Sequence, residues 1–371
     1  MGRHRRSHSP EEAAYEMHCR QWNGKPYYSL DCYLKQQFGE KLYKIAIDGG
    51  MTCPNRDGTL GKKGCIFCSQ RRFLCCVWHR TGRHPEHHAG DRGSGDFAVS
   101  RNITGDCLSP VPVHGTHVYS ALTYHAGIVT RQIDEGIRRL KDSRKYCGNR
   151  YIAYFQSYSN TYAPISYLRP LYEEALSHPL VAGVSIATRP DCFTPETHEL
   201  LATCHQQKPV WIELGLQTMH ERTAKLIRRG YPLSCFEETV QSLKEHGIPV
   251  IVHVILGLPG ETPEDMLETI RYLNTLGING IKLQLLHILQ GTTLADDWQK
   301  GLIDPLTKDE YIAILLDCIA HLSPDIVVHR ITGDGPKDLL LAPTWSLHKR
   351  DILNTIAHQM KQTHLYQGCL I

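Results

Sequence analysis

The sequence predicts an α/β fold built on a parallel sheet, and two features of its patterning support this. Short apolar runs rich in β-branched residues alternate along the chain with amphipathic segments of helical period. Such alternation is typical of strands that run parallel and wind in one sense, as a βα barrel or an open sheet. Six runs precede Leu289, which is fewer than the eight strands of a closed (β/α)8 barrel.

The strands and helices can be placed individually. The six predicted strands begin at Leu42, Tyr151, Val181, Pro209, Pro249 and Asn279. Two of the helices between them have explicit start signals, because Thr194 and Thr262 can act as N-caps with a proline at the next position. Gly247 and Gly277 stand where two helices should end.

The rhythm changes after Leu289. A helix near 308–322, a strand from Asp325, a Gly-rich turn at 332–338 and a final helix at about 347–361 follow. We therefore expect a core over 22–290 and a C-terminal α/β extension over 291–371 that completes or covers the sheet.

Composition excludes some classes of protein. With 41% hydrophobic and 21% charged residues, the chain resembles a soluble globular protein, and its net charge of +3 implies no strong field for polyanions. No apolar run is long enough for a membrane span. Residues 1–21 have basic residues but no apolar run of a secretory signal, and we expect a disordered tail. Without such a signal, the 14 cysteines favour reduced thiols and metal ligands in a cytoplasmic protein.

Two segments, near 69–92 and 100–128, interrupt the pattern as irregular insertions. Both exceed ordinary loop lengths, so each is either functional or disordered. The first contains Cys75, Cys76, His79 and His84, which could bind a second metal. It is otherwise an insertion that could disturb a neighbouring site.

A cysteine-rich loop directly follows the first predicted strand. The stretch "DGGMTCPNRDGTLGKKGCIFCSQ" contains Cys53, Cys65 and Cys68. One interpretation is a structural zinc site in a non-catalytic adaptor for RNA or protein, which would need a fourth ligand from the following segment. The other is an iron–sulfur cluster held by three thiolates, with one iron left open. Parallel α/β folds place active sites at the carboxyl ends of strands, so the position favours catalysis.

Several motifs in order make the sequence recognisable. They include "CPNRDGTLGKKGCIFC", "YIAYFQSYSNTYAP", "VSIATRPDC", "WIELGLQT", "VILGLPGET", "KLQLLHILQGTTL" and "HRITGDGPKDLLLAPTWSLHKRDIL". With them the chain, from about Trp22, resembles the radical S-adenosylmethionine (SAM) superfamily. It is most similar to the YhcC/YtqA-type family, which is related to the radical-SAM domain of the elongator catalytic subunit.

The resemblance implies a fold and two cofactors. The fold is a partial (βα)6 radical-SAM barrel with the C-terminal extension. Cys53, Cys65 and Cys68 would ligate a [4Fe–4S] cluster whose open iron chelates SAM. An electron from flavodoxin or ferredoxin would lead to cleavage of SAM to a 5′-deoxyadenosyl radical.

The resemblance also implies which residues contact SAM. Phe67 would pack beside the adenine. Gln217 and Arg229, with Glu213 nearby, would serve the ribose and the carboxylate. Gln156, with Ser157 and Asn160, lies where relatives have a Gly-rich stretch for the amino group, and Gly257 permits close backbone approach.

Substrate-side candidates are polar residues near the predicted strand ends. They are His287, His329, Arg330, Asp334 and Lys337. The resemblance implies a role in tRNA wobble-uridine modification, with tRNA as a partner, although the sequence contains no RNA-binding motif. We expect no membrane partner.

Overall fold

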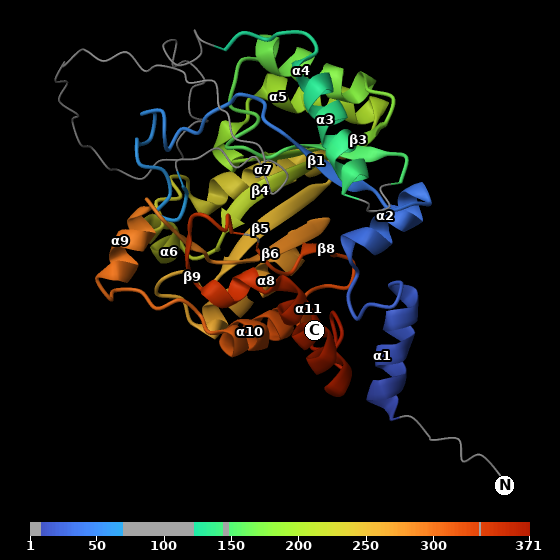
Figure 1. Cartoon of the computed structure of the whole chain (residues 1–371), viewed down its shortest axis with the longest axis vertical. Helices are drawn as coiled ribbons and strands as arrows, with labels where there is room; N and C mark the ends of the chain where they lie inside the picture. The colour runs from blue at the N-terminus through green and yellow to red at the C-terminus, as the bar shows by residue number, and fades with distance from the viewer. Residues whose placement is uncertain (1–8, 70–121, 144–147, 334) are drawn as a thin grey trace.

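A curved parallel sheet lies at the centre of the molecule (Figure 1). The computed structural model describes residues 9–69, 122–143, 148–333 and 335–371. Seven strands in the order β1-β2-β3-β4-β5-β6-β8 form the sheet, and every neighbouring pair is parallel. A second, two-stranded sheet pairs β7 with β9.

The elements have the following bounds. The strands are β1 (Tyr43–Ile47), β2 (Tyr151–Phe155), β3 (Val181–Thr188), β4 (Val210–Gln217), β5 (Val250–Leu256), β6 (Gly280–Leu285), β7 (Ile288–Leu289), β8 (Val327–Arg330) and β9 (Leu340–Ala342). The α-helices are α1 (Pro10–Gln21), α2 (Leu30–Phe38), α3 (Ile128–Asp142), α4 (Ile165–Ser177), α5 (Pro195–Gln207), α6 (Glu221–Leu226), α7 (Leu233–Glu245), α8 (Pro263–Thr275), α9 (Thr293–Gln299), α10 (Lys308–Ala320) and α11 (Lys349–Gln362). Two 3₁₀ turns are η2 (Pro190–Cys192) and η3 (Thr344–Leu347).

The predicted sheet is confirmed and extended by one strand. The six expected strands are β1 to β6, and the strand expected from Asp325 is β8, which pairs with β6. The C-terminal extension therefore completes the sheet. Helix α3 is not among the predicted elements, and it begins at the end of the segment expected to be irregular.

Contacts between non-adjacent strands show how strongly the sheet curves. Lys44 on β1 reaches Glu213 on β4, with 2.5 Å between Nζ and Oε1. Lys282 on β6 donates to the hydroxyl of Tyr154 on β2 over 3.0 Å. Such contacts require the strands to wrap around a common lumen, so the sheet is a partial barrel.

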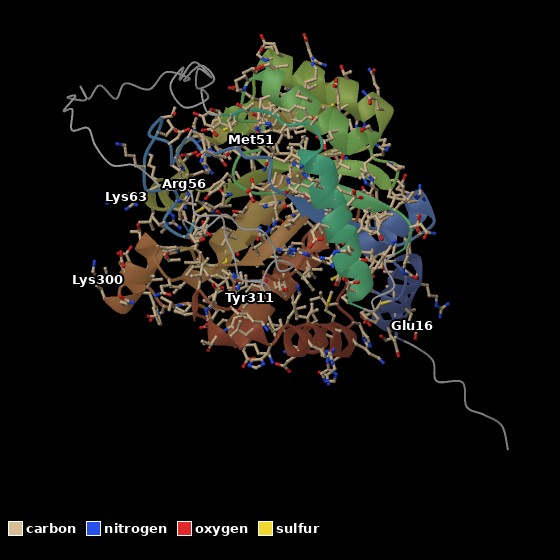
Figure 2. The ribbon with its side chains drawn as sticks, turned by 45° about the horizontal axis from the view of Figure 1, so that its top comes forward. Glu16, Met51, Arg56, Lys63, Lys300 and Tyr311 are labelled. Atoms are coloured by element: carbon tan, nitrogen blue, oxygen red, sulfur yellow. The ribbon has the colours of Figure 1, made fainter. Side chains whose placement is uncertain are left out.

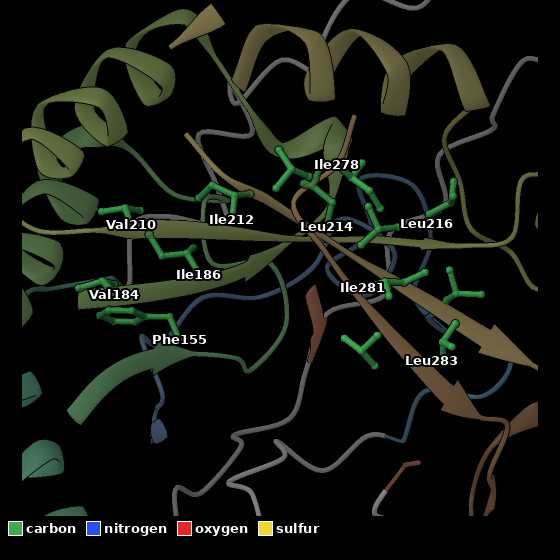
Figure 3. Close-up of a cluster of buried hydrophobic side chains, with 14 of the residues drawn as sticks. Phe155, Val184, Ile186, Val210, Ile212, Leu214, Leu216, Ile278, Ile281 and Leu283 are labelled. Atoms are coloured by element: carbon green, nitrogen blue, oxygen red, sulfur yellow. The ribbon is translucent and has the colours of Figure 1, made fainter. Parts of the chain in front are cut away.

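The convex face of the sheet carries the main hydrophobic core. Phe155, Ile186, Ile212 and Leu214 alternate with lumen-facing residues and are at most 1% exposed (Figure 3). Helices such as α4, α5, α7 and α8 cover this face, as expected for parallel strands that are buried on both sides.

Apolar side chains fill the lumen near the amino ends of the strands. Leu34 of α2 packs there with Ile152, Trp211 and Ile251 from three strands. Ser29, the N-cap of α2, also forms a parallel bridge with Val328 on the edge strand β8. Helix α2 therefore closes one end of the barrel.

The N-terminal segment corrects one expectation. Pro10–Gln21 form α1, whereas we expected a disordered tail over 1–21. Ser9 caps the helix, Pro10 occupies its first turn, and Glu11 and Glu12 favour its positive end. These local signals favour a helix even though the segment has no apolar stripe to pack against the core.

None of the helices in the described residues is both long and apolar enough to cross a bilayer.

Candidate functional site

The three cysteines lie in one loop that leaves the carboxyl end of β1. Backbone hydrogen bonds fold this loop on itself: the carbonyl of Cys53 accepts from the amide of Arg56 over 2.8 Å, and that of Cys65 accepts from the amide of Cys68 over 3.1 Å. Gly64 has a φ of +72°, a left-handed conformation that glycine adopts without strain. The density of Gly, Pro and Asn in the sequence is thus explained by tight turns.

Asn55 connects the loop to the turn after α6. Its Nδ2 donates to the carbonyls of Arg228 and Arg229 over 2.8 and 3.1 Å, and it lies 3.5 Å from the Cys65 sulfur. The Asn55 side chain is buried, so these bonds satisfy groups that water does not reach. Ile66 adds a backbone bond to Ile227 over 3.2 Å. Two segments far apart in sequence therefore fix the position of Cys65.

Arg56 holds the other end of the loop. Its guanidinium donates to the carbonyls of Cys68 and Ser69 over 2.6 and 2.7 Å. Figure 2 shows Arg56 and Lys63 of this loop on the same side of the molecule as Lys300, which follows α9. The amide of Leu294 in α9 also donates to the carbonyl of Ile66 over 3.0 Å, so α9 supports the loop.

The thiols are affected by burial and by two nearby cations, Arg189 and Arg56. Burial raises the pKa of Cys53, and it raises the pKa of Cys65 to about 11. Arg189 opposes this effect at both thiols. Arg189 is itself oriented by Asp191, whose oxygens accept from it over 2.8 and 2.7 Å. A positive group beside the sulfurs favours their thiolate forms, which are the forms that bind metal.

The spacing of the thiols bears on which metal group fits. Among the described residues, only His220, Asp265 and Glu268 have ligand atoms that all lie within 4.8 Å of one another. Thiolates on one zinc ion lie about 2.3 Å from the metal, hence about 4 Å apart. The three sulfurs are not such a group, so at least one pair of them lies more than 4.8 Å apart. Three thiolates in one loop have the chemistry of iron–sulfur cluster ligands.

The expected SAM residues on β4 and after it are held by protein contacts. Gln217 has a φ of +66° at the end of β4. Arg229 is 1% exposed, and its guanidinium donates to the carbonyls of Thr218 and Tyr231 over 2.7 and 3.1 Å and to Glu221 over 2.8 Å. It is therefore not at a solvated helix end, and it fixes the turn that follows Gln217.

Phe67 and Gly257 lie near the same edge of the sheet. Phe67 is half-buried against a second apolar cluster that includes Ile227 and Leu294. Gly257 has a φ of +87°, and a Cβ there would lie 2.9 Å from Leu306. The positive φ favours glycine here whether or not SAM binds, because L side chains rarely adopt it. The contacts of both residues with SAM stay predictions.

Glu213 lies deeper than the strand ends, at the centre of a buried polar layer. Its carboxylate contacts Lys282, lies 2.5 Å from Lys44 Nζ and 2.8 Å from His253 Nε2, and accepts from Tyr154 and Ser185 over 2.8 and 2.7 Å. Each of six consecutive strands contributes one side chain to this group, which we call the polar layer. Protein groups surround the carboxylate, so a direct role of Glu213 on SAM stays a prediction.

Burial and charge act against each other within the polar layer. Burial alone would raise the pKa of Glu213, but Lys282 and Lys44 hold it well below its usual value. Burial lowers the pKa of Lys282 to about 7 and that of His253 to about 4. Glu213 is therefore a carboxylate that two lysines share.

The remaining candidates fall into two groups. Gln156, His329 and Arg330 line a cavity beside β1 together with Lys44 and Lys282. Asn160, after β2, is instead fully buried and donates to the carbonyl of Ala187 over 2.8 Å.

The turn after β8 lies against the end of β6. A Cβ on Gly333 would come within 2.6 Å of the His287 ring, so the structure brings His287 to this turn. Lys337 is exposed. Asp334 lies outside the described residues, as do Cys75, Cys76, His79 and His84 of the first insertion.

Several residues of the site are absent from the sequence-based candidates. Asn55, Arg56 and Arg189 lie inside the quoted motifs without an assigned role. The polar layer could have been detected in the sequence, because each of its members is a polar residue inside an otherwise apolar strand: Lys44, Tyr154, Ser185, His253 and Lys282. A buried polar residue in such a run needs a partner, and the sequence does not say which.

Comparisons with known proteins identify the family. The model of the Radical SAM superfamily matches residues 60–273, and that of the Radical_SAM C-terminal domain matches 278–362. The chain is 38% identical to YtqA of Bacillus subtilis (strain 168) over 93% of its own length and 92% of that protein. It is 31% identical to YhcC of Escherichia coli (strain K12) over 84% of its length and 85% of that protein.

More distant similarities concern tRNA enzymes and the fold. A tRNA uridine(34) acetyltransferase of Dehalococcoides mccartyi (strain CBDB1) is 29% identical over 42% of this chain and 34% of that protein. The solved structure of Methanocaldococcus infernus Elp3 superposes with a TM-score of 0.55 at 17% identity, over 64% of this chain and 59% of that one. That likeness supports the partial barrel. The chain is an enzyme of the radical SAM superfamily and belongs to the same family as YtqA and YhcC.

Proposed function

We propose that this enzyme holds a [4Fe–4S] cluster through Cys53, Cys65 and Cys68 and uses it to cleave SAM. The observation that supports the proposal best is that all three cysteines lie in one loop at the carboxyl edge of the barrel, which Asn55 and Arg56 hold in place through hydrogen bonds. With SAM bound, such a cluster supplies a 5′-deoxyadenosyl radical that abstracts hydrogen from a substrate.

The chain's own residues position the two cofactors in this proposal. Asn55 donates toward the Cys65 sulfur, and hydrogen bonds to ligand sulfurs tune a cluster's potential. Arg189 stabilises the thiolates before the metal binds. Phe67 and Gln217 contact SAM, and Arg229 holds the turn that carries Gln217. Flavodoxin or ferredoxin donates the electron.

We further propose that the substrate is the wobble uridine of tRNA. Support comes from the relatives, because one similar protein is named a tRNA uridine(34) acetyltransferase. That acetyltransferase matches 42% of this chain. The nucleoside is therefore proposed from the similarity to relatives, and not from the residues of the site.

The cluster proposal can be tested by anaerobic reconstitution with iron and sulfide. We expect about four irons per chain and formation of 5′-deoxyadenosine on reduction with SAM. Cys53→Ala, Cys65→Ala and Cys68→Ala should each abolish cleavage, whereas Cys19→Ser on the remote helix α1 should not. One zinc and no iron in protein purified without oxygen would instead indicate an adaptor, and cleavage that survives in all three alanine variants would refute the proposal.

The tRNA proposal needs a separate measurement. Nucleosides from tRNA of cells that lack the protein should show a changed 5-substituent on uridine at the wobble position, detected by mass spectrometry. Complementation with the wild-type chain should restore the profile, and complementation with Cys65→Ala should not. An unchanged profile in the deletion strain would reject the tRNA substrate and leave the cluster proposal intact.

A further inference from the structure

A cavity of about 700 Å³ adjoins the polar layer on the side of β1. Its walls come from β1, β2, β6 and β8 and from helix α3, and Lys44, Tyr154, Lys282, His329 and Arg330 line it. This volume lies within the range of about 300–1,000 Å³ that is typical of sites for small molecules. The cavity is therefore large enough for a metabolite beyond a single ion.

Positive charge exceeds negative charge around this cavity. Among the described residues, five basic side chains line it: Lys44, Arg131, Arg139, Lys282 and Arg330. The lining carboxylates are Asp48 and Glu135, and Glu135 is already paired with Arg138 and Arg139. Behind the wall, Lys44 and Lys282 share the single carboxylate of Glu213. Within the described part of the chain, two of the lining cations, Arg131 and Arg330, form no ion pair.

The excess charge is concentrated where β8 borders the cavity. The Arg330 side chain is half-buried and has neither an ion pair nor a hydrogen bond within the described part of the chain. Beside it, Nδ1 of His329 is buried without a hydrogen-bond partner. Burial of unpaired polar groups is costly, so native proteins retain them mostly where a ligand or water will pair them.

We propose that this cavity binds the anionic group, a carboxylate or a phosphate, of a small co-substrate. Arg330 binds the anion through its planar fork of donors, which matches both groups. Arg131 adds a second positive charge to the lining, and His329 offers a further hydrogen bond. The inference rests on the proposed function, because the anion would be part of a co-substrate that this enzyme transforms. Binding of the anion does not depend on cleavage of SAM.

The test is calorimetric titration of the full-length chain with malonate and, separately, with inorganic phosphate, in a low-salt buffer without multivalent anions. Malonamide serves as the neutral probe. We expect saturable binding of at least one anion and none of malonamide. Tighter binding of malonate indicates a carboxylate ligand, and tighter binding of phosphate indicates a phosphorylated one.

Arg330→Gln tests the assignment within the cavity. It should weaken anion binding at least 10-fold, because it removes the positive charge and the planar fork of donors that the anion pairs with. Arg138→Gln is the matched control, since Arg138 lies on α3 in exposed ion pairs outside the lining and its loss should leave affinity within about 2-fold. Circular dichroism of both variants checks that they fold.

Three results would overturn the inference: no saturable binding of either anion, equal affinity of wild type and Arg330→Gln, or equal loss in both variants. Each can occur while SAM cleavage is intact, and failed cleavage would not alter the titration. The inference and the proposed function can therefore fail independently.

Discussion

Glu213 shows how much a single residue can organise in this molecule. It is 1% exposed and interacts with side chains from five other strands of the barrel. A buried carboxylate is tolerated only when its oxygens are paired, and here the pairing comes from lysines on β1 and β6, which lie on either side of β4 in the strand order. The polar layer thus fixes the curvature of the strands as well as their register.

Lys282→Met should destabilise the protein by about 3–5 kcal/mol, because it leaves Glu213 as an incompletely paired buried charge. Urea unfolding of the metal-free protein measures the change. Arg138→Met, which removes exposed ion pairs, should cost less than about 1 kcal/mol. The double variant Glu213→Gln/Lys282→Met should recover part of the loss. A Lys282→Met protein as stable as wild type would show that the pair contributes nothing to folding.

The site was predictable from the sequence where function depends on residue type and spacing. Cys53, Cys65 and Cys68 stand out for this reason, and the loop and its position after β1 are confirmed. The partners of the cysteines were not predictable, because Asn55 bonds to carbonyls more than 170 positions away. The sequence also does not predict that the side chains of Arg229 and Glu213 are buried, because their burial depends on how the strands curve.

Helix α3 illustrates what decides the placement of a whole element. It packs on β1, and Gly136 is the point of closest approach: a Cβ at this position would overlap Cγ2 of Ile45. Val129, Ile133 and Ile137 form its buried stripe. The stripe has helical period, but the segment lacks a side-chain N-cap, and so it has no start signal of the kind that Thr262 gives α8.

Gly136→Ala should destabilise the protein by about 1–3 kcal/mol, because the added methyl group forces α3 away from β1. In an exposed helix the same change would stabilise by roughly 0.5–1 kcal/mol, so the sign of the effect is diagnostic. Thermal and urea unfolding measure it. The double variant Gly136→Ala/Ile45→Ala should lose less than the sum of the two single variants. A gain in stability for Gly136→Ala would contradict the close packing.

For the molecule as a whole, Gln367 joins the two ends of the described chain. Its Nε2 donates to the carbonyls of Ser323 and Ile326 over 2.6 and 2.8 Å, and its Oε1 accepts from the amide of Tyr28 over 2.9 Å. The side chain is 1% exposed. The end of the C-terminal extension is thereby tied to the turn before β8 and to the segment before α2.

Gln367→Ala should lower the free energy of unfolding by about 2–5 kcal/mol, because it leaves three buried backbone groups unpaired at about 1–3 kcal/mol each when none is resolvated. Gln362→Ala at the exposed end of α11 is the control and should stay within about 0.5 kcal/mol. Tryptophan fluorescence and circular dichroism should report one coincident transition in both variants. Separate transitions would mean that the extension and the core unfold independently.

The amide of Asn55 has a consequence for how the two cofactors would affect each other. It bonds the cysteine loop to the carbonyls of Arg228 and Arg229, so a ligand that immobilises the loop also immobilises the turn near Gln217. Thermodynamic linkage is reciprocal: whatever factor the metal group adds to the affinity for SAM, SAM must add to retention of the metal group. On the proposed function, these shared hydrogen bonds would couple the two binding equilibria, so that the cofactor that binds first would prepare the place of the second.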